Sequence, residues 1–407
     1  MIERWQKDEV VASLKCFRVV NITGARQCGK TTLAEMIPFS SAKRFALDDD
    51  ETRKAAKSDP YGFVARADGE TIVIDEIQKA PELLNAIKMR VDKNNSKGQY
   101  LLTGSANLHF VKAVTDSLAG RIGRVRLRTL ALGEIQGGSG DFIERAFARD
   151  FPREIPVLDK RGIIGLATRS GYPEAMEMDA NMRRKWFRTY LDDLLVKDMQ
   201  DVTEIRKLDA MRTVAEWLFS YSSKFFEASE LAAKARIGKE TVDAYIATLK
   251  ALYLFDEVRP WTKGDYSKIG KRSKYFAADA GLMANILGWQ EDSIYMSDDR
   301  SGKLIENWVY QNLACLVDRD SVYEISQYRD SNKREIDFIV ERSDGAMLGI
   351  EVKSGSSFGK DDFKHLKWFA NNLAKGCQFT GIVLYSGANT LPFGEGFYAV
   401  PLAALGG

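Results

Sequence analysis

Short apolar runs alternate with helix-like segments along the first third of the chain. The β-branched run at residues 16–23 ends at a glycine, and later runs at 71–74 and 100–102 end at Asp-Glu and Thr-Gly-Ser. Short apolar runs that end at turn or polar residues are typical of buried strands. Because helix-like segments separate the runs, the pattern predicts a parallel β-sheet with crossover helices, in an α/β domain of residues 1–140.

The periodicity then becomes helical, and strand-like segments return in the last third. Residues 141–208 are predicted to form a helical region. Residues 209–275 are predicted to contain two helices separated by a tight turn at 236–238, followed by a strand at 254–258. This order is typical of a winged helix-turn-helix. Strands and helices alternate again in residues 276–407, which predicts a second α/β domain.

The composition is that of a globular protein with several domains. The chain has 407 residues, of which 45% are hydrophobic and 29% are charged, and this length exceeds one ordinary core. The net charge of +2 does not indicate a nucleic-acid partner, so only local charge can. Four cysteines without a CxxC pair, with only two histidines, argue against zinc and disulfide frameworks and suggest a reducing cytoplasm. No apolar run reaches about 18 residues, so we expect no membrane span.

A phosphate-binding signature follows the first predicted strand. Residues 24–31 match GxxxxGK[ST], with a strand before and a helix after them. Glycines let backbone amides approach phosphates, and Lys30 is expected to reach the β- and γ-phosphates of ATP. The Thr31 hydroxyl is expected to bind Mg²⁺. The predicted nucleotide-binding residues are Gly24, Ala25, Arg26, Gln27, Cys28, Gly29, Lys30, Thr31, Thr32 and Asp75.

Polar residues at the next strand ends extend this predicted site. Asp75 is expected in the Mg²⁺ shell, and Glu76 in a position to polarise the attacking water. Thr103 is expected to hydrogen-bond the γ-phosphate or that water. Arg121 is either an arginine finger, acting in cis or in trans, or an ordinary surface arginine. The sequence therefore predicts an enzyme that binds and hydrolyses ATP.

Several segments of this region resemble a known family. They are Leu-Asp-Asp at 47–49, Asp-Glu-Ile-Gln-Lys-Ala-Pro-Glu-Leu-Leu at 75–84, Leu-Thr-Gly-Ser at 102–105 and Leu-Ala-Gly-Arg at 118–121. They resemble the prokaryotic AAA+-related ATPases with a C-terminal DUF4143 domain, and the resemblance continues through Gly-Tyr-Pro-Glu at 171–174 and the last third. It implies an ATPase core, a winged helix and a nuclease-like C-terminal domain. Such AAA+ relatives often act as rings, so a homo-oligomer is one expectation.

Acidic side chains mark two predicted strands of the last third, which a tight turn joins. Asp337 lies on the first strand, and Glu351 and Lys353 share a face of the second. This set can hold Mg²⁺ or Mn²⁺ and activate water for attack on a phosphodiester, and Glu306 on the preceding helix could add a ligand. The arrangement resembles the PD-(D/E)XK nuclease fold, with Ile336 in place of the motif's proline. The alternatives are a surface hairpin with a Glu351–Lys353 salt bridge, or a nuclease-like fold that only binds.

Basic and aromatic residues gather around the predicted wing. They are Lys234, Arg236, Lys239, Trp261, Lys263, Tyr266, Lys268, Lys271, Arg272 and Lys274. A wing of this kind would contact the phosphates of DNA or RNA, and the alternative is a solvated loop beside a protein-binding winged helix. Two hypotheses follow. Either ATP turnover is coupled to nucleic-acid binding or metal-dependent cleavage, or the chain is an ATP-driven switch or adaptor whose nuclease-like domain binds a partner without cutting.

Overall fold

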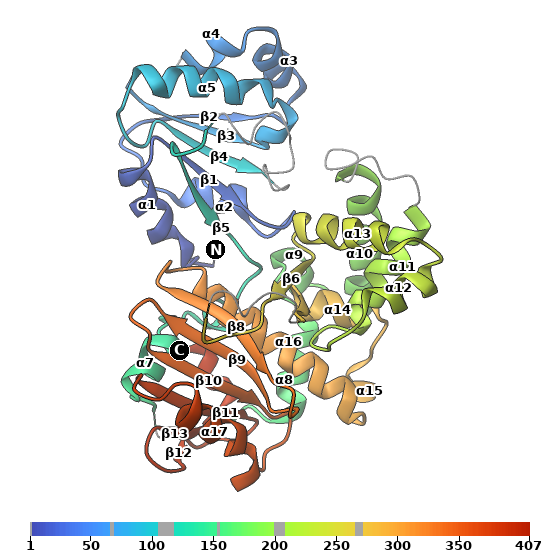
Figure 1. The fold of residues 1–407 in the computed structure, drawn as a ribbon. Coiled ribbons are helices and arrows are strands. Elements are labelled where there is room, and N and C mark those ends of the chain that lie inside the picture. Colours follow the sequence, from blue (N-terminus) through green and yellow to red (C-terminus); the bar gives the residue numbers. More distant parts are fainter. Residues whose placement is uncertain (1, 66–68, 105–117, 153–154, 199–207, 265–271) are drawn as a thin grey trace.

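The computed structural model describes residues 2–65, 69–104, 118–152, 155–198, 208–264 and 272–407. An α/β region, a helical middle region and a second α/β region follow one another (Figure 1). Part of the predicted wing, including Tyr266, Lys268 and Lys271, lies outside the described residues. No helix in the described ranges is long and apolar enough to cross a membrane.

The first sheet has five strands in the order β2-β3-β4-β1-β5, and neighbouring strands are parallel. The predicted parallel α/β domain is therefore confirmed, and the sheet fits a P-loop NTPase. Its strands are β1 (Val19–Thr23), β2 (Ala42–Ala46), β3 (Thr71–Asp75), β4 (Tyr100–Gly104) and β5 (Ile122–Arg126). Every residue of β1 and β4 is buried, as expected for strands covered on both faces.

Helices cover both faces of this sheet. The helices are α1 (Gln6–Cys16), α2 (Lys30–Met36), α3 (Asp50–Ser58), α4 (Pro60–Ala65), the short η1 (Ile77–Lys79) and α5 (Glu82–Lys93). Alternate residues of β1 belong to different cores: Val19 packs with residues of α3, α4 and α5, whereas Val20 and Ile22 pack with residues of α1 and α2. This alternation follows from the two-residue period of a strand.

The middle region is mostly helical. Its elements are α6 (Leu132–Gln136), α7 (Phe142–Ala148), α8 (Lys160–Arg169), α9 (Pro173–Met176), α10 (Ala180–Asp193), the π-helix η3 (Leu194–Asp198), α11 (Leu208–Ser220), α12 (Ala228–Ala235), α13 (Lys239–Ala251), β6 (Phe255–Val258), β7 (Lys274–Ala277), α14 (Ala280–Ile286) and α15 (Glu291–Tyr295). Helices α12 and α13 flank the predicted turn, in which Arg236 is left-handed at φ 54°, and their winged-helix identity stays a prediction. Strands β6 and β7 form an antiparallel ribbon.

The last region is a mixed six-stranded sheet in the order β12-β13-β11-β10-β9-β8, with helices beside it. Its elements are α16 (Asp298–Val317), β8 (Tyr323–Arg329), β9 (Glu335–Arg342), β10 (Met347–Val352), η5 (Lys360–Phe363), α17 (Lys364–Asn372), β11 (Phe379–Tyr385), β12 (Leu391–Pro392), β13 (Phe397–Pro401) and η6 (Leu402–Gly406). The predicted hairpin of β9 and β10 is confirmed, and Gly345 in its turn is left-handed at φ 85°. The proposed nuclease-like identity of this fold remains a prediction.

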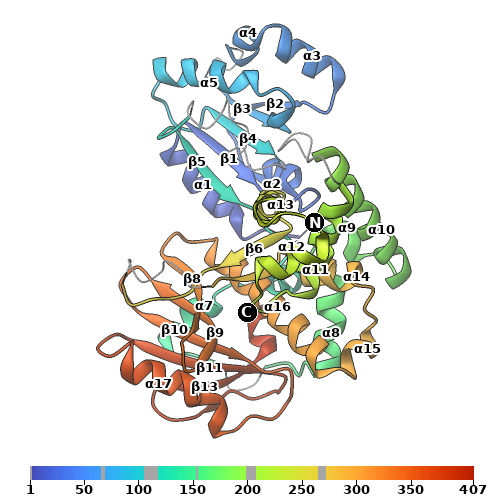
Figure 2. The ribbon, with the colours of Figure 1, turned by 45° about the vertical axis from the view of Figure 1, so that its right-hand side comes forward.

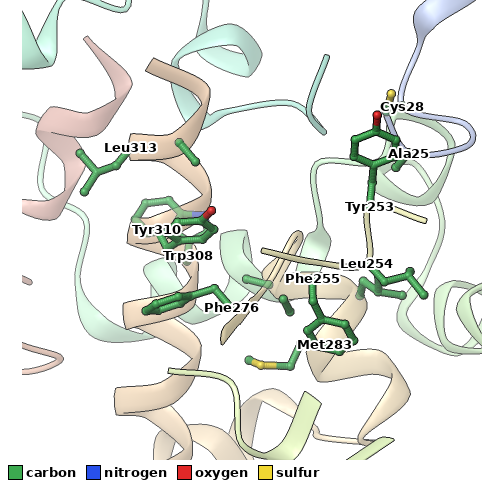
Figure 3. Packing of buried hydrophobic residues seen from close by; sticks show 14 of the residues in the cluster. Ala25, Cys28, Tyr253, Leu254, Phe255, Phe276, Met283, Trp308, Tyr310 and Leu313 are labelled. Carbon is green, nitrogen blue, oxygen red and sulfur yellow. The ribbon is translucent and has the colours of Figure 1, made fainter. Parts of the chain in front are cut away.

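Buried ion pairs and aromatic contacts join the three regions. Arg128 of the first region bonds to Asp256 on β6 and to Asp318 at the end of α16. The Phe276 ring on β7 stacks on Tyr310 of α16, with centroids 4.6 Å apart (Figure 3). Figures 1 and 2 both show β6 next to β8, where Pro260 bridges to Gln327. The β6–β7 ribbon therefore contacts both of the regions that carry predicted sites.

Candidate functional sites

The phosphate-binding loop leaves the carboxyl end of β1 and enters α2. Gly24 packs so closely that a Cβ atom there would lie 2.1 Å from the carbonyl oxygen of Leu127. Gly29 caps α2 at φ 101°, a left-handed conformation that favours glycine. The two glycines of the signature are thus required by close packing and by backbone conformation. A helix N-terminus behind such a loop presents free N–H groups to an anion.

Lys30 is buried and its side chain folds back over the loop. Its Nζ donates to the carbonyl oxygens of Ala25 at 2.7 Å and of Gly24 at 3.2 Å. Both acceptors are neutral carbonyl groups. These two bonds therefore leave the positive charge of the ammonium group available to a phosphate. Among the other predicted loop residues, Arg26, Gln27 and Thr32 are exposed.

Three predicted residues from separate strands and from α2 meet at the carboxyl edge of the sheet. The Thr31 hydroxyl donates to Asp75 Oδ2 at 2.9 Å, and the Thr103 hydroxyl bonds to the other oxygen of Asp75. The Glu76 N–H donates to Thr103 Oγ1 at 3.3 Å. A threonine hydroxyl beside a carboxylate is the oxygen donor set that Mg²⁺ prefers, so these residues fit the ion. The sequence prediction that they lie together is met.

Glu76 follows this cluster in an uncommon backbone conformation, with φ 57° and ψ 46°. Burial raises the pKa of its carboxyl, while Lys30 opposes this and Asp75 adds to it. The Gln78 side chain, which the sequence reasoning did not identify, donates to Glu76 Oε2. A carboxylate with a raised pKa beside a phosphate loop is suited to accept a proton from water.

Residues far from the motif hold the loop from outside. Arg4, just before α1, donates to the carbonyls of Cys28 at 2.8 Å and Arg128 at 2.7 Å, and pairs with the buried Glu134 at 2.9 Å. The Tyr190 hydroxyl on α10 donates to the Arg26 carbonyl at 3.0 Å. No local signature in the sequence marks Arg4 or Tyr190, so pattern reasoning missed them.

Cys28 itself is fully buried, with its thiol 3.5 Å from the Leu127 carbonyl oxygen. Figure 3 shows it beside Ala25 and Tyr253, so its side chain packs in the core beneath the loop.

Arg121 does not join the loop of its own chain. It precedes β5, whose Ile122 pairs with Val19 at the amino end of β1, whereas the loop follows the carboxyl end. Its guanidinium pairs with Asp92 of α5 and donates to the Ala119 carbonyl at 2.9 Å. Because the strands are parallel, Arg121 and the loop lie at opposite edges of the sheet. This position does not support a cis arginine finger in this conformation.

A second cluster of charged residues surrounds Lys274 of β7. Its Nζ lies 2.6 Å from Glu335 Oε1, 3.1 Å from Glu306 Oε1 and 3.7 Å from Asp337 Oδ1. Only 2% of the Lys274 side chain is exposed. Asp337 also accepts a bond from the Val352 N–H at 2.9 Å, next to Glu351. Glu306, Asp337 and Glu351 are thus brought together as predicted. Lys274 and Glu335 join them, and no sequence pattern indicated that they would.

Burial dominates the electrostatics of this cluster. It raises the pKa of Glu306 to about 7, with Lys274 acting in the opposite direction and Asp337 in the same one. Burial, then Asp337, raises the pKa of Glu351 well above its usual range. For Lys274, burial opposes the charged form, but Glu306, Asp337 and Glu335 outweigh it and raise the pKa. The lysine therefore stays positively charged among the carboxyl groups.

This geometry corrects two predictions. Among the residues that the structure describes, no three His, Cys, Asp or Glu side chains are placed to hold a metal ion. The predicted site of Glu306, Asp337 and Glu351 therefore is not formed in this conformation, because the Lys274 ammonium lies among their carboxylates. Lys353 pairs instead with Asp362 at 2.9 Å. The prediction that Lys274 contacts nucleic acid as part of a wing is also wrong here, since it is buried.

Other residues of the predicted basic wing differ in exposure. Trp261 is buried, donates to Glu341 Oε2 at 3.0 Å and packs on Phe369. Lys239 and Lys263 are exposed, and the exposed Arg272 pairs with Glu227. The exposed basic side chains in and beside the turn between α12 and α13 are Lys234, Arg236 and Lys239.

Three models of protein families match this chain. An AAA domain matches residues 17–136, a domain of unknown function called DUF8612 matches residues 161–293, and DUF4143 matches residues 301–405. Curated relatives include uncharacterized proteins of Mycobacterium bovis and Mycobacterium tuberculosis. Each is 26% identical over 345 residues, which is 83% of this chain and 71% of the relative.

Similar solved structures include a signal transduction ATPase with a tetratricopeptide repeat sensor from Pyrococcus horikoshii, at 13% identity and a TM-score of 0.23. An Hsp104–ADP complex of S. cerevisiae has 11% identity and a TM-score of 0.28. These matches cover 77% and 78% of this chain but only 45% and 44% of the other chains. TM-scores this low do not establish a shared fold. The family matches and the loop geometry together support an AAA-like P-loop ATPase with a C-terminal DUF4143 domain.

Proposed function

We propose that this chain binds ATP with Mg²⁺ at residues 24–31 and hydrolyses it. The observation that carries the proposal is the bonded set of Thr31, Asp75 and Thr103 beside the buried Lys30. Two protein oxygens suited to Mg²⁺ and one ammonium group held by neutral carbonyls match the charge pattern of a metal–triphosphate complex.

Each residue has a distinct role in this proposal. The N–H groups of the loop and of the first turn of α2 bind phosphate oxygens, and Lys30 neutralises their charge. Thr31 and Asp75 hold Mg²⁺, which when bound neutralises charge on the β- and γ-phosphates. Glu76 orients water and accepts its proton, for which its raised pKa is suited. Thr103 fixes the orientation of Asp75 through its hydroxyl.

Glu76→Gln tests this assignment. We expect ATP turnover to fall roughly 10²–10⁴-fold, the usual contribution of general-base catalysis, while ATP binding is retained. Phosphate release would measure turnover, and equilibrium titration with a fluorescent ATP analogue would measure binding. Glu35→Gln, an exposed glutamate on α2, is the matched control. Unchanged turnover in the Glu76 variant would refute the role of Glu76, and no ATP binding by the wild type would refute the site.

For the rest of the chain, we propose that nucleotide turnover drives a switch whose C-terminal domain binds a partner. This reading is favoured over nuclease activity by Lys274, which lies among the carboxylates in place of a metal. Metal-dependent cleavage of nucleic acid stays the second candidate, because Asp337 and Glu351 do lie together on neighbouring strands.

Incubation of the wild type with ATP, Mg²⁺ or Mn²⁺, and single- or double-stranded DNA or RNA separates these candidates. Cleavage that Asp337→Asn abolishes would establish the nuclease. Binding without cleavage would establish a nucleic-acid switch, and its affinity should fall steeply with salt and in Lys234→Glu/Lys239→Glu. A chain that neither binds nor cuts nucleic acid would leave a protein partner for the switch.

A further inference from the structure

Lys274 comes from a different region than the carboxylates it contacts. The lysine lies on β7 of the middle region, whereas Glu306 belongs to α16, and Glu335 and Asp337 belong to β9. The contacts at 2.6 and 3.1 Å are ordinary charge-assisted bonds, and the ammonium is almost fully buried. A single ammonium group thus neutralises several carboxylates, as a bound cation would.

The ribbon that carries Lys274 also reaches the phosphate-binding loop. In its ladder Val258 pairs with Lys274, and Asp256 pairs with Phe276. Asp256 bonds to both Arg126 and Arg128. Arg126 ends β5 opposite Thr23, the last residue of β1 before the loop. Within the four-residue strand β6, only Glu257 therefore separates the residue that contacts the nucleotide region, Asp256, from the residue that pairs with Lys274, Val258.

A second contact joins the start of the ribbon to the loop. Tyr253 precedes β6 in a left-handed conformation at φ 59°. Its hydroxyl hydrogen-bonds Thr23, and the Arg126 guanidinium lies 5.1 Å from the centre of its ring. Figure 3 shows Tyr253 directed toward Ala25 and Cys28 of the loop. A shift of the loop would therefore act on the ribbon at two neighbouring points.

We propose that Lys274 is a built-in cation that closes the C-terminal carboxylate cluster to divalent ions, and that nucleotide at the loop withdraws it through the β6–β7 ribbon. The second half rests on the proposed ATP site. With Lys274 withdrawn, the oxygens of Glu306, Glu335 and Asp337 are available to a divalent ion, whose hard character suits carboxylate ligands. In this way, nucleotide bound at the first sheet controls whether a divalent ion can bind at the last sheet.

The first test measures Mn²⁺ binding by calorimetry without nucleotide. We expect Lys274→Met to bind one Mn²⁺ at least about tenfold more tightly than the wild type, because the competing charge is gone. Lys274→Arg keeps the charge and should show no gain. Lys250→Met removes another lysine bonded to this ribbon, at Glu257, and should also show none. Adding Asp337→Asn to Lys274→Met should abolish the gain.

A folded Lys274→Met protein, judged by circular dichroism, without tighter Mn²⁺ binding would overturn the closure. So would a gain that survives Asp337→Asn, since the ion would then bind elsewhere. The following measurement on the unaltered chain covers the case in which Lys274→Met does not fold.

Hydrogen exchange tests the connection in the wild type. With Mg²⁺ and a non-hydrolysable ATP analogue, we expect slower exchange at residues 24–31 and at least about threefold faster exchange at β7, with β13 unchanged as an internal control. Asp256→Asn should keep the first effect and lose the second. Protection of the loop with β7 unchanged would overturn the connection. No protection of the loop would refute the ATP site itself, while the Mn²⁺ result would still stand on its own.

Discussion

The phosphate-binding loop and the carboxylate cluster each contain a buried lysine, but the two lysines have different partners. Lys30 bonds to two carbonyl oxygens that lie five and six residues before it. Lys274 bonds to carboxylates from two distant elements. A lysine held by neutral acceptors can turn to a phosphate at little cost, whereas a lysine among partly buried carboxylates can leave only if another cation replaces its charge. The first arrangement is open to a ligand and the second is closed.

The largest expected difference is in stability. Lys274→Met leaves partly buried carboxylates without their cation, so we expect a loss of up to about 3–5 kcal/mol in the free energy of unfolding near neutral pH. Lys30→Met leaves only carbonyl groups, and we expect a loss of at most about 1–2 kcal/mol. Urea unfolding, followed by circular dichroism, would compare the two variants directly. Equal losses would mean that the difference in their partners has no energetic consequence.

The order is reversed for activity. Lys30→Ala removes the positive charge that we propose neutralises the phosphates, so we expect ATP turnover to fall roughly 10²–10³-fold. Lys57→Ala, an exposed lysine on α3, provides a control of the same type. Phosphate release at saturating ATP would measure both. Turnover that survives Lys30→Ala would contradict the proposed site.

The sequence predicted the open site better than the closed one, for a physical reason. Lys30 and Thr31 act within one loop, and Asp75 and Thr103 end neighbouring parallel strands, so chain order alone brings them together. Lys274 reaches Glu335 only because the β6–β7 ribbon packs against α16 and β8. The spacing of residues along the chain does not predict that packing.

The roles of single charged residues outside the motifs could not be predicted from the sequence for the same reason. Arg4 lies far along the chain from Glu134 and belongs to no motif, yet it supports the loop through the Cys28 carbonyl. Lys274 stood in a run of basic residues, and such a run predicts exposure. Its burial depends on carboxylates that the chain supplies later, from α16 and β9.

The pH dependence of stability gives a smaller contrast. Burial raises the pKa of Glu306 to about 7 in the folded chain, in a site that it shares with Lys274, Asp337 and Glu335. A raised pKa stabilises the fold fully below the unfolded value near 4.5, and this contribution is lost as the pH rises through about 7. Between these values the wild type should lose up to about 3 kcal/mol more than Glu306→Gln does.

Urea unfolding at several pH values would measure this difference. Glu324→Gln, an exposed glutamate on β8, is the control and should follow the wild type. Parallel curves for the wild type and Glu306→Gln would show that Glu306 carries the same charge in the folded and unfolded chains.

The smallest effect is expected at Arg121, which belongs to neither cluster. Its exposed pair with Asp92 lies at the edge of the first sheet opposite the loop, so we expect Arg121→Ala to leave ATP turnover unchanged at low protein concentration. Asp92→Ala breaks the same pair and should behave identically. If a neighbouring copy of the chain uses Arg121 at its own nucleotide, turnover of the wild type will rise with protein concentration. Arg121→Ala will then lose that rise while Asp92→Ala keeps it, so the pair of variants separates a surface ion pair from an arginine finger that acts in trans.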